Sequence, residues 1–114
     1  MEGNGAEEGG ASVREVFLYL CWGGRLEGTG NGELSYVGGT SDCVWITQGM
    51  RYDEVVKVVE ATVEDGLRGR RILYSTKYDR KMLLPLQRDG DVGKLVKGND
   101  EFGYMYIEER DVPI

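Results

Sequence analysis

The segment Arg14–Trp22 (REVFLYLCW) most constrains how this chain can fold. In an extended chain, alternate side chains point to opposite sides, and here both sets are apolar or aromatic. A strand that is apolar on both faces is typical of the interior of a sheet rather than its edge. We therefore expect a central strand that ends at the pair Gly23-Gly24.

A second strand region is expected after a glycine-rich connection. Residues Arg25–Gly32 (RLEGTGNG) are polar and carry an Asn-Gly pair, which is typical of turns. Strand character resumes over Glu33–Thr47 and is interrupted at Gly38-Gly39. We expect the two halves of Glu33–Thr47 to form an antiparallel hairpin with the first strand.

Residues Arg51–Asp65 are predicted to form the main helix. Apolar side chains recur there at steps of three and four residues, at Tyr52, Val55, Val56, Val59 and Val63. Asp53 and Glu54 lie in the first turn, and Gly66 follows the end. The many valines favour a strand instead. The spacing and the acidic first turn favour the helix.

The remaining segments complete an α+β pattern. A basic turn is expected at Gly66–Arg71, then strands at Ile72–Lys77, Lys81–Leu86 and Phe102–Glu109. Before the last strand, Asp89-Gly90-Asp91 is predicted to be a tight turn that begins a short helix, with Asp91 as its N-cap. The order predicts a mixed sheet of about five strands with one main and one short helix.

The length of 114 residues indicates one domain. Residues 1–12, rich in Gly and Glu, and residues 110–114 are expected to be tails, the first of them disordered. The chain does not begin with a basic and then apolar stretch, and no apolar run has the length of a membrane span. We therefore expect an intracellular protein of the cytoplasm or nucleus, in which Cys21 and Cys43 are buried, reduced thiols.

Catalysis and metal binding are not expected. Histidine, the commonest general base and metal ligand, is absent from the sequence. A calcium loop that began at Asp89 would place Gly93 and Lys94 where an oxygen ligand and a glycine are required. We expect a protein that is not an enzyme and has no cofactor.

Basic residues flank the third predicted strand, at Arg68, Arg70, Arg71, Lys77, Arg80 and Lys81. With Tyr74 and Tyr78 among them, they could form a nucleic-acid patch. The favoured interpretation is a solvated face that balances an acidic protein, and a third is a surface that receives an acidic turn from another module. The net charge of −6 disfavours nucleic acid and anionic membranes as partners.

Several segments together resemble the Phox and Bem interaction domain, a ubiquitin-like β-grasp module. They are CWGGR (Cys21–Arg25), GELSYVGG (Gly32–Gly39), the helix around Tyr52–Val63, ILYSTK (Ile72–Lys77), RDGDVGKLV (Arg88–Val96) and YMYIEE (Tyr104–Glu109). The resemblance covers Val13–Glu109. It is closest to the plant forms found in Raf-like kinases and in Mutator-like transposases and the genes derived from them.

The resemblance implies that such modules pair front to back, with an acidic loop and helix against a basic strand surface. Asp89 and Asp91 match the last two acidic positions of that motif, and Asp100 and Glu101 lie near its C-terminal part. The earlier acidic positions hold Gln87 and Arg88, and the strand lysine falls at about Tyr19.

The resemblance therefore implies a non-catalytic scaffold or signalling module, homotypic or heterotypic. It would dock through Asp89, Asp91, Asp100 and Glu101 onto a basic face of another module. The alternative is a nucleic-acid-associated module of a transposase-derived protein that uses the Arg68–Lys81 patch.

Overall fold

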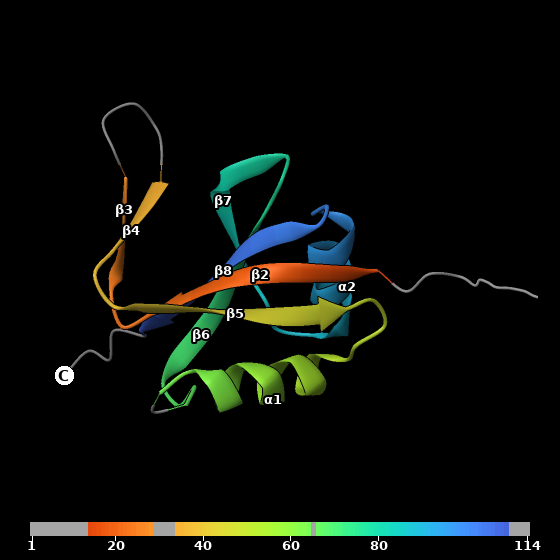
Figure 1. The fold of residues 1–114 in the computed structure, drawn as a ribbon, viewed down its shortest axis with the longest axis horizontal. Coiled ribbons are helices and arrows are strands. Elements are labelled where there is room, and N and C mark those ends of the chain that lie inside the picture. Colours follow the sequence, from red (N-terminus) through yellow and green to blue (C-terminus); the bar gives the residue numbers. More distant parts are fainter. Residues whose placement is uncertain (1–13, 29–33, 65, 110–114) are drawn as a thin grey trace, which may run out of the picture.

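The computed structural model describes residues 14–28, 34–64 and 66–109. The expected tails at 1–12 and 110–114 lie outside the described residues. In chain order the elements are β2 (Glu15–Trp22), β3 (Arg25–Gly28), β4 (Leu34–Val37), β5 (Thr40–Thr47), α1 (Tyr52–Thr62), β6 (Arg70–Thr76), β7 (Asp79–Pro85), α2 (Asp89–Lys97) and β8 (Phe102–Glu109) (Figure 1).

Five of the strands form one mixed sheet in the order β5-β2-β8-β6-β7. The strands β2 and β8 lie side by side and parallel, and each further pair is antiparallel. The expected central position of the first strand is confirmed, because β2 pairs with β5 on one side and β8 on the other. The predicted α+β class is confirmed, and the strand order is compatible with a ubiquitin-like β-grasp.

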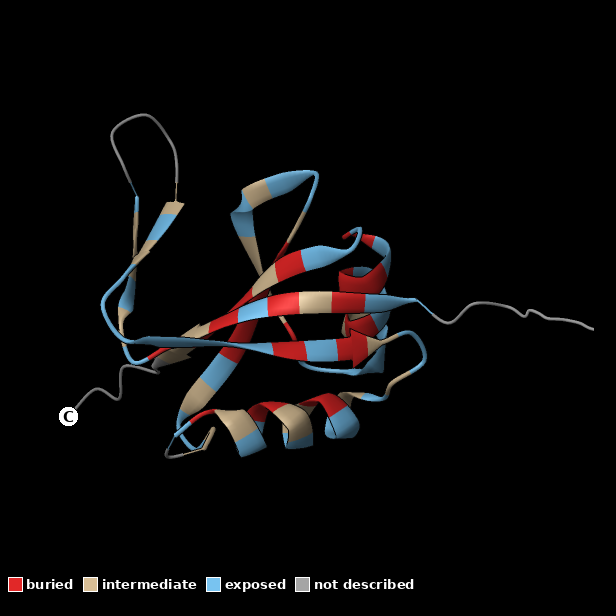
Figure 2. Ribbon diagram, viewed as in Figure 1, coloured by how far each residue is buried: buried red, intermediate tan, exposed pale blue. Residues whose placement is uncertain are grey.

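Both helices pack against the same face of this sheet. The core joins alternate residues of the strands, such as Val16, Leu18 and Leu20 of β2, to Val55 and Val59 of α1. The second helix contributes Val92, Leu95 and Val96 to the same cluster. Figure 2 shows that buried residues alternate with less buried ones along the central strand β2. The other face has no helix over it among the described residues.

The main helix is confirmed, although it is shorter than the predicted Arg51–Asp65. It begins at Tyr52, where the Glu54 side chain accepts the N–H of Arg51 at 2.9 Å, and ends at Thr62. The four-residue spacing decides against the competing strand, because it places Val55 and Val59, and Val63 just past the helix end, on the core side.

The glycine-rich connection was wrongly predicted to lack a strand. Residues Arg25–Gly28 form β3, which pairs with β4 in a separate two-stranded hairpin. Only the second half of Glu33–Thr47 pairs with the first strand, as β5. The pairs Gly23-Gly24 and Gly38-Gly39 permit this, because the chain turns away from the sheet at one pair and returns at the other.

Two further predictions need correction. Cys43 is exposed and Cys21 is half-buried, because both belong to the sheet face opposite the helices. Strands β6 and β7 each begin about two residues before the predicted Ile72 and Lys81. The β6 extension reflects pairing of Arg70 and Arg71 with the end of β8, a long-range contact without a local sequence signal.

Candidate protein-binding interface

Asp89, the first predicted docking residue, joins the two helices. Its carboxylate accepts the backbone N–H of Tyr52 at 2.7 Å. Tyr52 is the first residue of α1, so this N–H has no partner within its own helix. Asp89 therefore stabilises the N-terminus of α1 in addition to carrying an exposed charge.

Asp91 is not the N-cap of the short helix. The helix begins at Asp89 with Arg88 in the N-cap position, and Asp91 lies in its first turn. There, its side chain accepts the backbone N–H of Gln87 at 2.9 Å. The prediction misplaced the N-cap by three residues because an acidic residue is favoured both at an N-cap and within the first turn.

Asp100 and Glu101 lie beyond the other end of α2, in the loop before β8. The helix α2 is nine residues or about 13 Å long, and Asp89 and Asp91 lie in its first turn, at the opposite end. Asp100 forms an ion pair with Lys77, with 2.7 Å between Oδ1 and Nζ. This hydrogen bond lowers the pKa of Asp100 and raises the pKa of Lys77. The structure therefore does not gather the four acidic residues into one cluster.

The predicted basic residues also fall into two groups. Arg68, Arg70 and Arg71 lie at the start of β6, and Lys77, Arg80 and Lys81 lie past its end, about 20 Å along the strand. Tyr74 is buried on the core side, so it cannot stack on a nucleic-acid base as the patch required.

Ion pairs and hydrogen bonds occupy several of these cations. Arg71 pairs with Glu108, and Lys77 pairs with Asp100. The Arg70 guanidinium donates to the carbonyl oxygens of Glu64 and Gly66, at 2.8 and 2.9 Å. Of the first group, Arg70 thus helps to hold the turn between α1 and β6.

The face of the sheet that the helices leave open is aromatic. We call it the aromatic face and define it by Phe17, Tyr19, Trp45, Phe102, Tyr104 and Tyr106. Trp45, Phe102 and Tyr19 are 55%, 45% and 44% exposed. Side chains with this exposure bury little apolar area when the chain folds, so they contribute little to stability. Stability therefore does not explain why they are gathered on one surface.

The rings of the aromatic face touch one another across three strands. Phe17 of β2 lies edge-on to Trp45 of β5, with 4.9 Å between ring centroids. Tyr19 of β2 stacks on Tyr104 of β8 at 5.5 Å and meets Phe102 edge-on at 6.2 Å. The contacts make one continuous surface from the β5 edge to β8.

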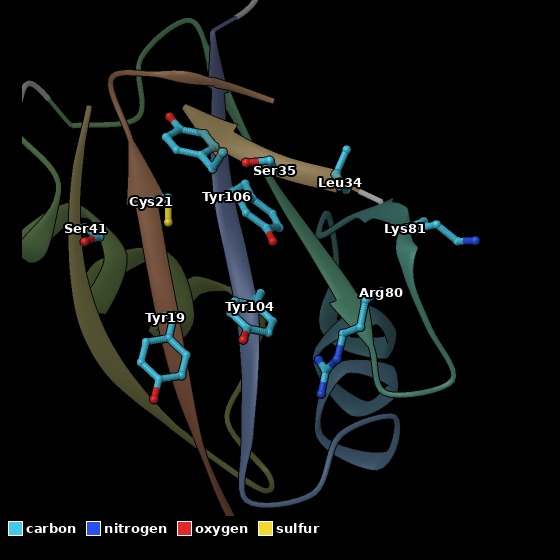
Figure 3. A pocket seen from close by; sticks show the side chains of 10 residues that line it. Tyr19, Cys21, Leu34, Ser35, Ser41, Arg80, Lys81, Tyr104 and Tyr106 are labelled. Atoms are coloured by element: carbon cyan, nitrogen blue, oxygen red, sulfur yellow. The ribbon is translucent and has the colours of Figure 1, made fainter. Parts of the chain in front are cut away.

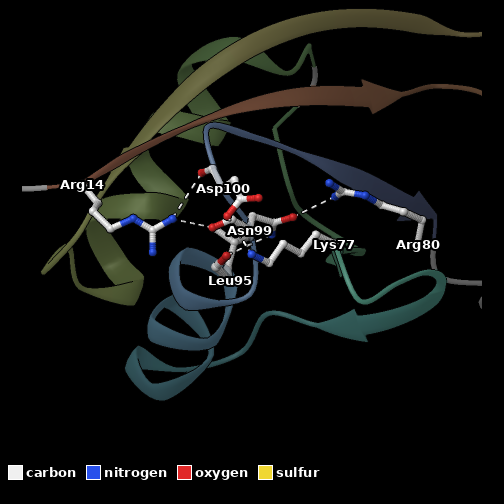
Figure 4. Close-up of polar contacts among 6 residues, drawn as sticks. All are labelled: Arg14, Lys77, Arg80, Leu95, Asn99 and Asp100. Carbon is white, nitrogen blue, oxygen red and sulfur yellow. Dashed lines mark hydrogen bonds and ion pairs between the residues drawn. The ribbon is translucent and has the colours of Figure 1, made fainter.

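Arg80 continues this surface with a positive charge. Its guanidinium carbon lies 5.4 Å from the ring centroid of Phe102 and 5.2 Å from that of Tyr104, a cation–π arrangement. One of its nitrogens donates to the side-chain oxygen of Asn99 at 2.8 Å (Figure 4). Asn99 is fully buried and so holds the guanidinium in place over the rings.

A groove of about 730 Å³ lies beside these rings (Figure 3). Its floor is formed by Tyr19 and Cys21 of β2 and by Tyr104 and Tyr106 of β8. The strand β4 borders it on one side, and Arg80 and Lys81 of β7 lie on the other. The groove and the aromatic face thus share Tyr19, Tyr104 and Tyr106.

Tyr106 should ionise unusually late. Burial in the groove floor, with smaller contributions from Cys21 and Tyr104, raises its pKa from the ordinary 10 to about 12. A raised pKa means that the fold favours the neutral phenol, so this stabilisation is complete below about pH 10 and is lost as the pH rises towards 12.

We expect a Tyr106→Phe variant to lose less stability than the wild type over that alkaline range. Denaturant unfolding at a series of pH values measures the difference, and ultraviolet titration of the phenols should lack one late ionisation in the variant. Identical pH dependence in both proteins would contradict the assignment.

The comparisons with known proteins identify no relative. No family model, curated protein or solved structure gives a significant match to this chain. Within the described residues, no cluster of three or more His, Cys, Asp or Glu side chains could hold a metal ion. None of the described helices combines the length and apolar character needed to cross a membrane.

The aromatic face was not among the predicted sites, although the sequence carries a signal for it. Aromatic residues alternate at Phe17 and Tyr19 and again at Phe102, Tyr104 and Tyr106. The alternation shows two apolar faces on the first strand, and this pattern predicts burial on both. Only the topology shows that both helices cover the same face.

Proposed function

We propose that this domain is a non-catalytic protein–protein interaction module that docks a partner on the aromatic face. The observation that carries the proposal is the exposure of Trp45, Phe102 and Tyr19 on one uncovered surface. Contiguous exposed apolar surface of this kind marks interaction sites. Trp, Tyr and Arg are also the residues most often responsible for binding energy at protein interfaces.

The proposal includes membership of the Phox and Bem family. The strand order is compatible with the β-grasp fold of those modules. The position where the resemblance places their docking lysine is Tyr19, which lies within the aromatic face. In this chain, an aromatic surface would therefore replace the basic one.

Docking through the acidic residues remains a second candidate. Asp89 and Asp91 are oriented by the N–H groups of Tyr52 and Gln87, and Asp89 is exposed. Their neighbours on α2 include the exposed cations Arg88, Lys94 and Lys97. These cations weaken the negative potential that would attract a basic partner, so we rank this surface second.

Nucleic-acid binding is the less favoured alternative. Phosphate contacts require a track of available Lys and Arg side chains. Here the basic residues are divided between the two ends of β6, and Arg71 and Lys77 are paired with carboxylates. The net charge of −6 further opposes a polyanion.

We expect the double variant Trp45→Ser/Phe102→Ser to lose partner binding. Partners can be isolated with a phage library that displays protein fragments from the source organism, and their affinities measured by calorimetry. Removing two exposed aromatic anchors should weaken binding at least about tenfold, or about 1.4 kcal/mol. Because neither side chain belongs to the buried core, the fold should be retained.

The matched control is Asp89→Asn/Asp91→Asn. Asparagine keeps an oxygen that can accept the N–H groups of Tyr52 and Gln87, but it removes both charges. We expect this variant to bind as the wild type does. Loss of binding in the control with none in the aromatic variant would overturn the proposal and assign docking to the acidic turn.

A further inference from the structure

The groove beside the aromatic face has fixed walls. The hydroxyl of Tyr36 in β4 accepts the backbone N–H of Gly24 at 2.7 Å, and its ring stacks on Tyr106 at 5.8 Å. On the other side, Arg80 is held by Asn99. The described hairpin strands are therefore attached to the sheet through Tyr36, and the groove exists before any partner binds.

The charge of the groove is opposite to that of the whole chain. Among the described residues that line it, the only charged ones are Arg80 and Lys81, and both are cations. No ion pair joins either of them to a carboxylate among the described residues. In a chain with a net charge of −6, this is a local positive site next to apolar rings.

We propose that the groove binds an extended peptide segment in which a carboxylate lies close to an aromatic or aliphatic side chain. This rests on the proposed function and specifies the chemistry of the partner. A carboxylate would pair either with the outward side of the Arg80 guanidinium or with Lys81, whose side chains point in different directions from β7 (Figure 3). The apolar side chain would lie on the rings of Tyr19 and Tyr104.

Size and charge favour a peptide over other occupants. The volume of about 730 Å³ lies within the range of about 300–1,000 Å³ typical of drug-sized ligands, which is comparable to a few residues. A single nucleic-acid strand could also stack on tyrosines, but it needs a positively charged groove along its backbone. The two cations, Arg80 and Lys81, match the charge of a ligand with one or two carboxylates rather than that of a nucleic-acid strand.

A selection from a phage library of random linear peptides, about ten residues long, tests the proposal. We expect the selected sequences to be enriched in Asp or Glu within about three positions of an aromatic or aliphatic residue. In synthetic versions of these peptides, replacing the acid by its amide should lower the affinity at least about tenfold.

The variant Lys81→Glu should lower the affinity for the same peptides at least tenfold, because it replaces a cation with an anion at the groove wall. Lys81 is exposed, and its described contact is made by its backbone N–H, so the variant should fold. The matched control is Lys57→Glu, which reverses an exposed charge on α1 and should leave peptide affinity unchanged.

Three results would overturn the groove assignment. They are selected peptides without acidic enrichment, equal affinity of the Lys81→Glu variant, and tighter binding of an oligothymidylate than of any selected peptide. None of the three by itself contradicts the proposed function. That function fails only if partner fragments bind Trp45→Ser/Phe102→Ser as tightly as the wild type.

Discussion

Replacing Gly39 by alanine is expected to destabilise the domain by at least about 3 kcal/mol. A Cβ at this position would lie 2.3 Å from the carbonyl oxygen of Trp22, 2.5 Å from the nitrogen of Gly24 and 2.8 Å from the carbonyl carbon of Gly23. All three atoms are backbone, so no side chain can move aside. The φ of +74° adds the cost of a left-handed conformation.

The matched control is the neighbouring substitution, Gly38→Ala. Gly38 has a φ of +75°, but a Cβ there would meet no atom within 4 Å. It should therefore cost only the left-handed backbone term of about 1–2 kcal/mol. Chemical denaturation of the two variants measures the difference between them. Equal destabilisation would show that the two double-glycine turns do not pack as closely as described.

The second large effect is expected for Asn99→Ala, at about 3 kcal/mol. The Asn99 amide donates to the carbonyl oxygen of Ser75 at 3.0 Å and to that of Leu95 at 2.9 Å, and its oxygen accepts Arg80. Asn99 is fully buried. Alanine would leave two carbonyl groups without this donor in a place that water does not reach.

Two comparison variants separate the buried network from its surroundings. In Asn99→Asp, an oxygen can still accept Arg80 but the donors to Ser75 and Leu95 are lost, so we expect no rescue. In Asp100→Ala, an exposed ion pair with Lys77 is removed, and stability should change little. Thermal unfolding measures all three. A stable Asn99→Ala protein, or a larger loss in Asp100→Ala, would contradict this role of Asn99.

Asn99 also links stability to the candidate interface. Its oxygen holds Arg80 over Phe102 and Tyr104, while its amide holds the end of α2 and β6. A substitution at Asn99 should therefore disturb the aromatic face from beneath. The exposed residues Trp45, Phe102 and Lys81 therefore report binding with less effect on stability than Asn99 does.

Local sequence patterns predicted much of the fold. The period-two pattern of Arg14–Trp22 located a central strand, and the three- and four-residue spacing after Arg51 located the main helix. These signals arise from burial within single elements. They failed for β3, where Arg25–Gly28 is stabilised by its partner β4 rather than by its own apolar pattern.

Local sequence patterns predicted less of the candidate interface than of the fold. The charge of the acidic residues marked them as candidates for docking. However, Asp89 accepts the N–H of Tyr52, a residue 37 positions away, and no local pattern predicts that contact. Likewise, the six basic residues are close in sequence, yet β6 carries them to opposite ends of a strand. The aromatic face is a property of the assembled sheet, because Trp45, Phe17 and Phe102 come from three separate strands.

An amide-shift titration of the domain with a partner fragment from the display selection tests the central claim most directly. We predict that the shifts concentrate in β2, the Trp45 end of β5, and the start of β8 around Phe102 and Tyr104. Shifts confined to Asp89–Asp91, or to the turn at Arg68–Arg71, with none on these strands, would contradict docking on the aromatic face.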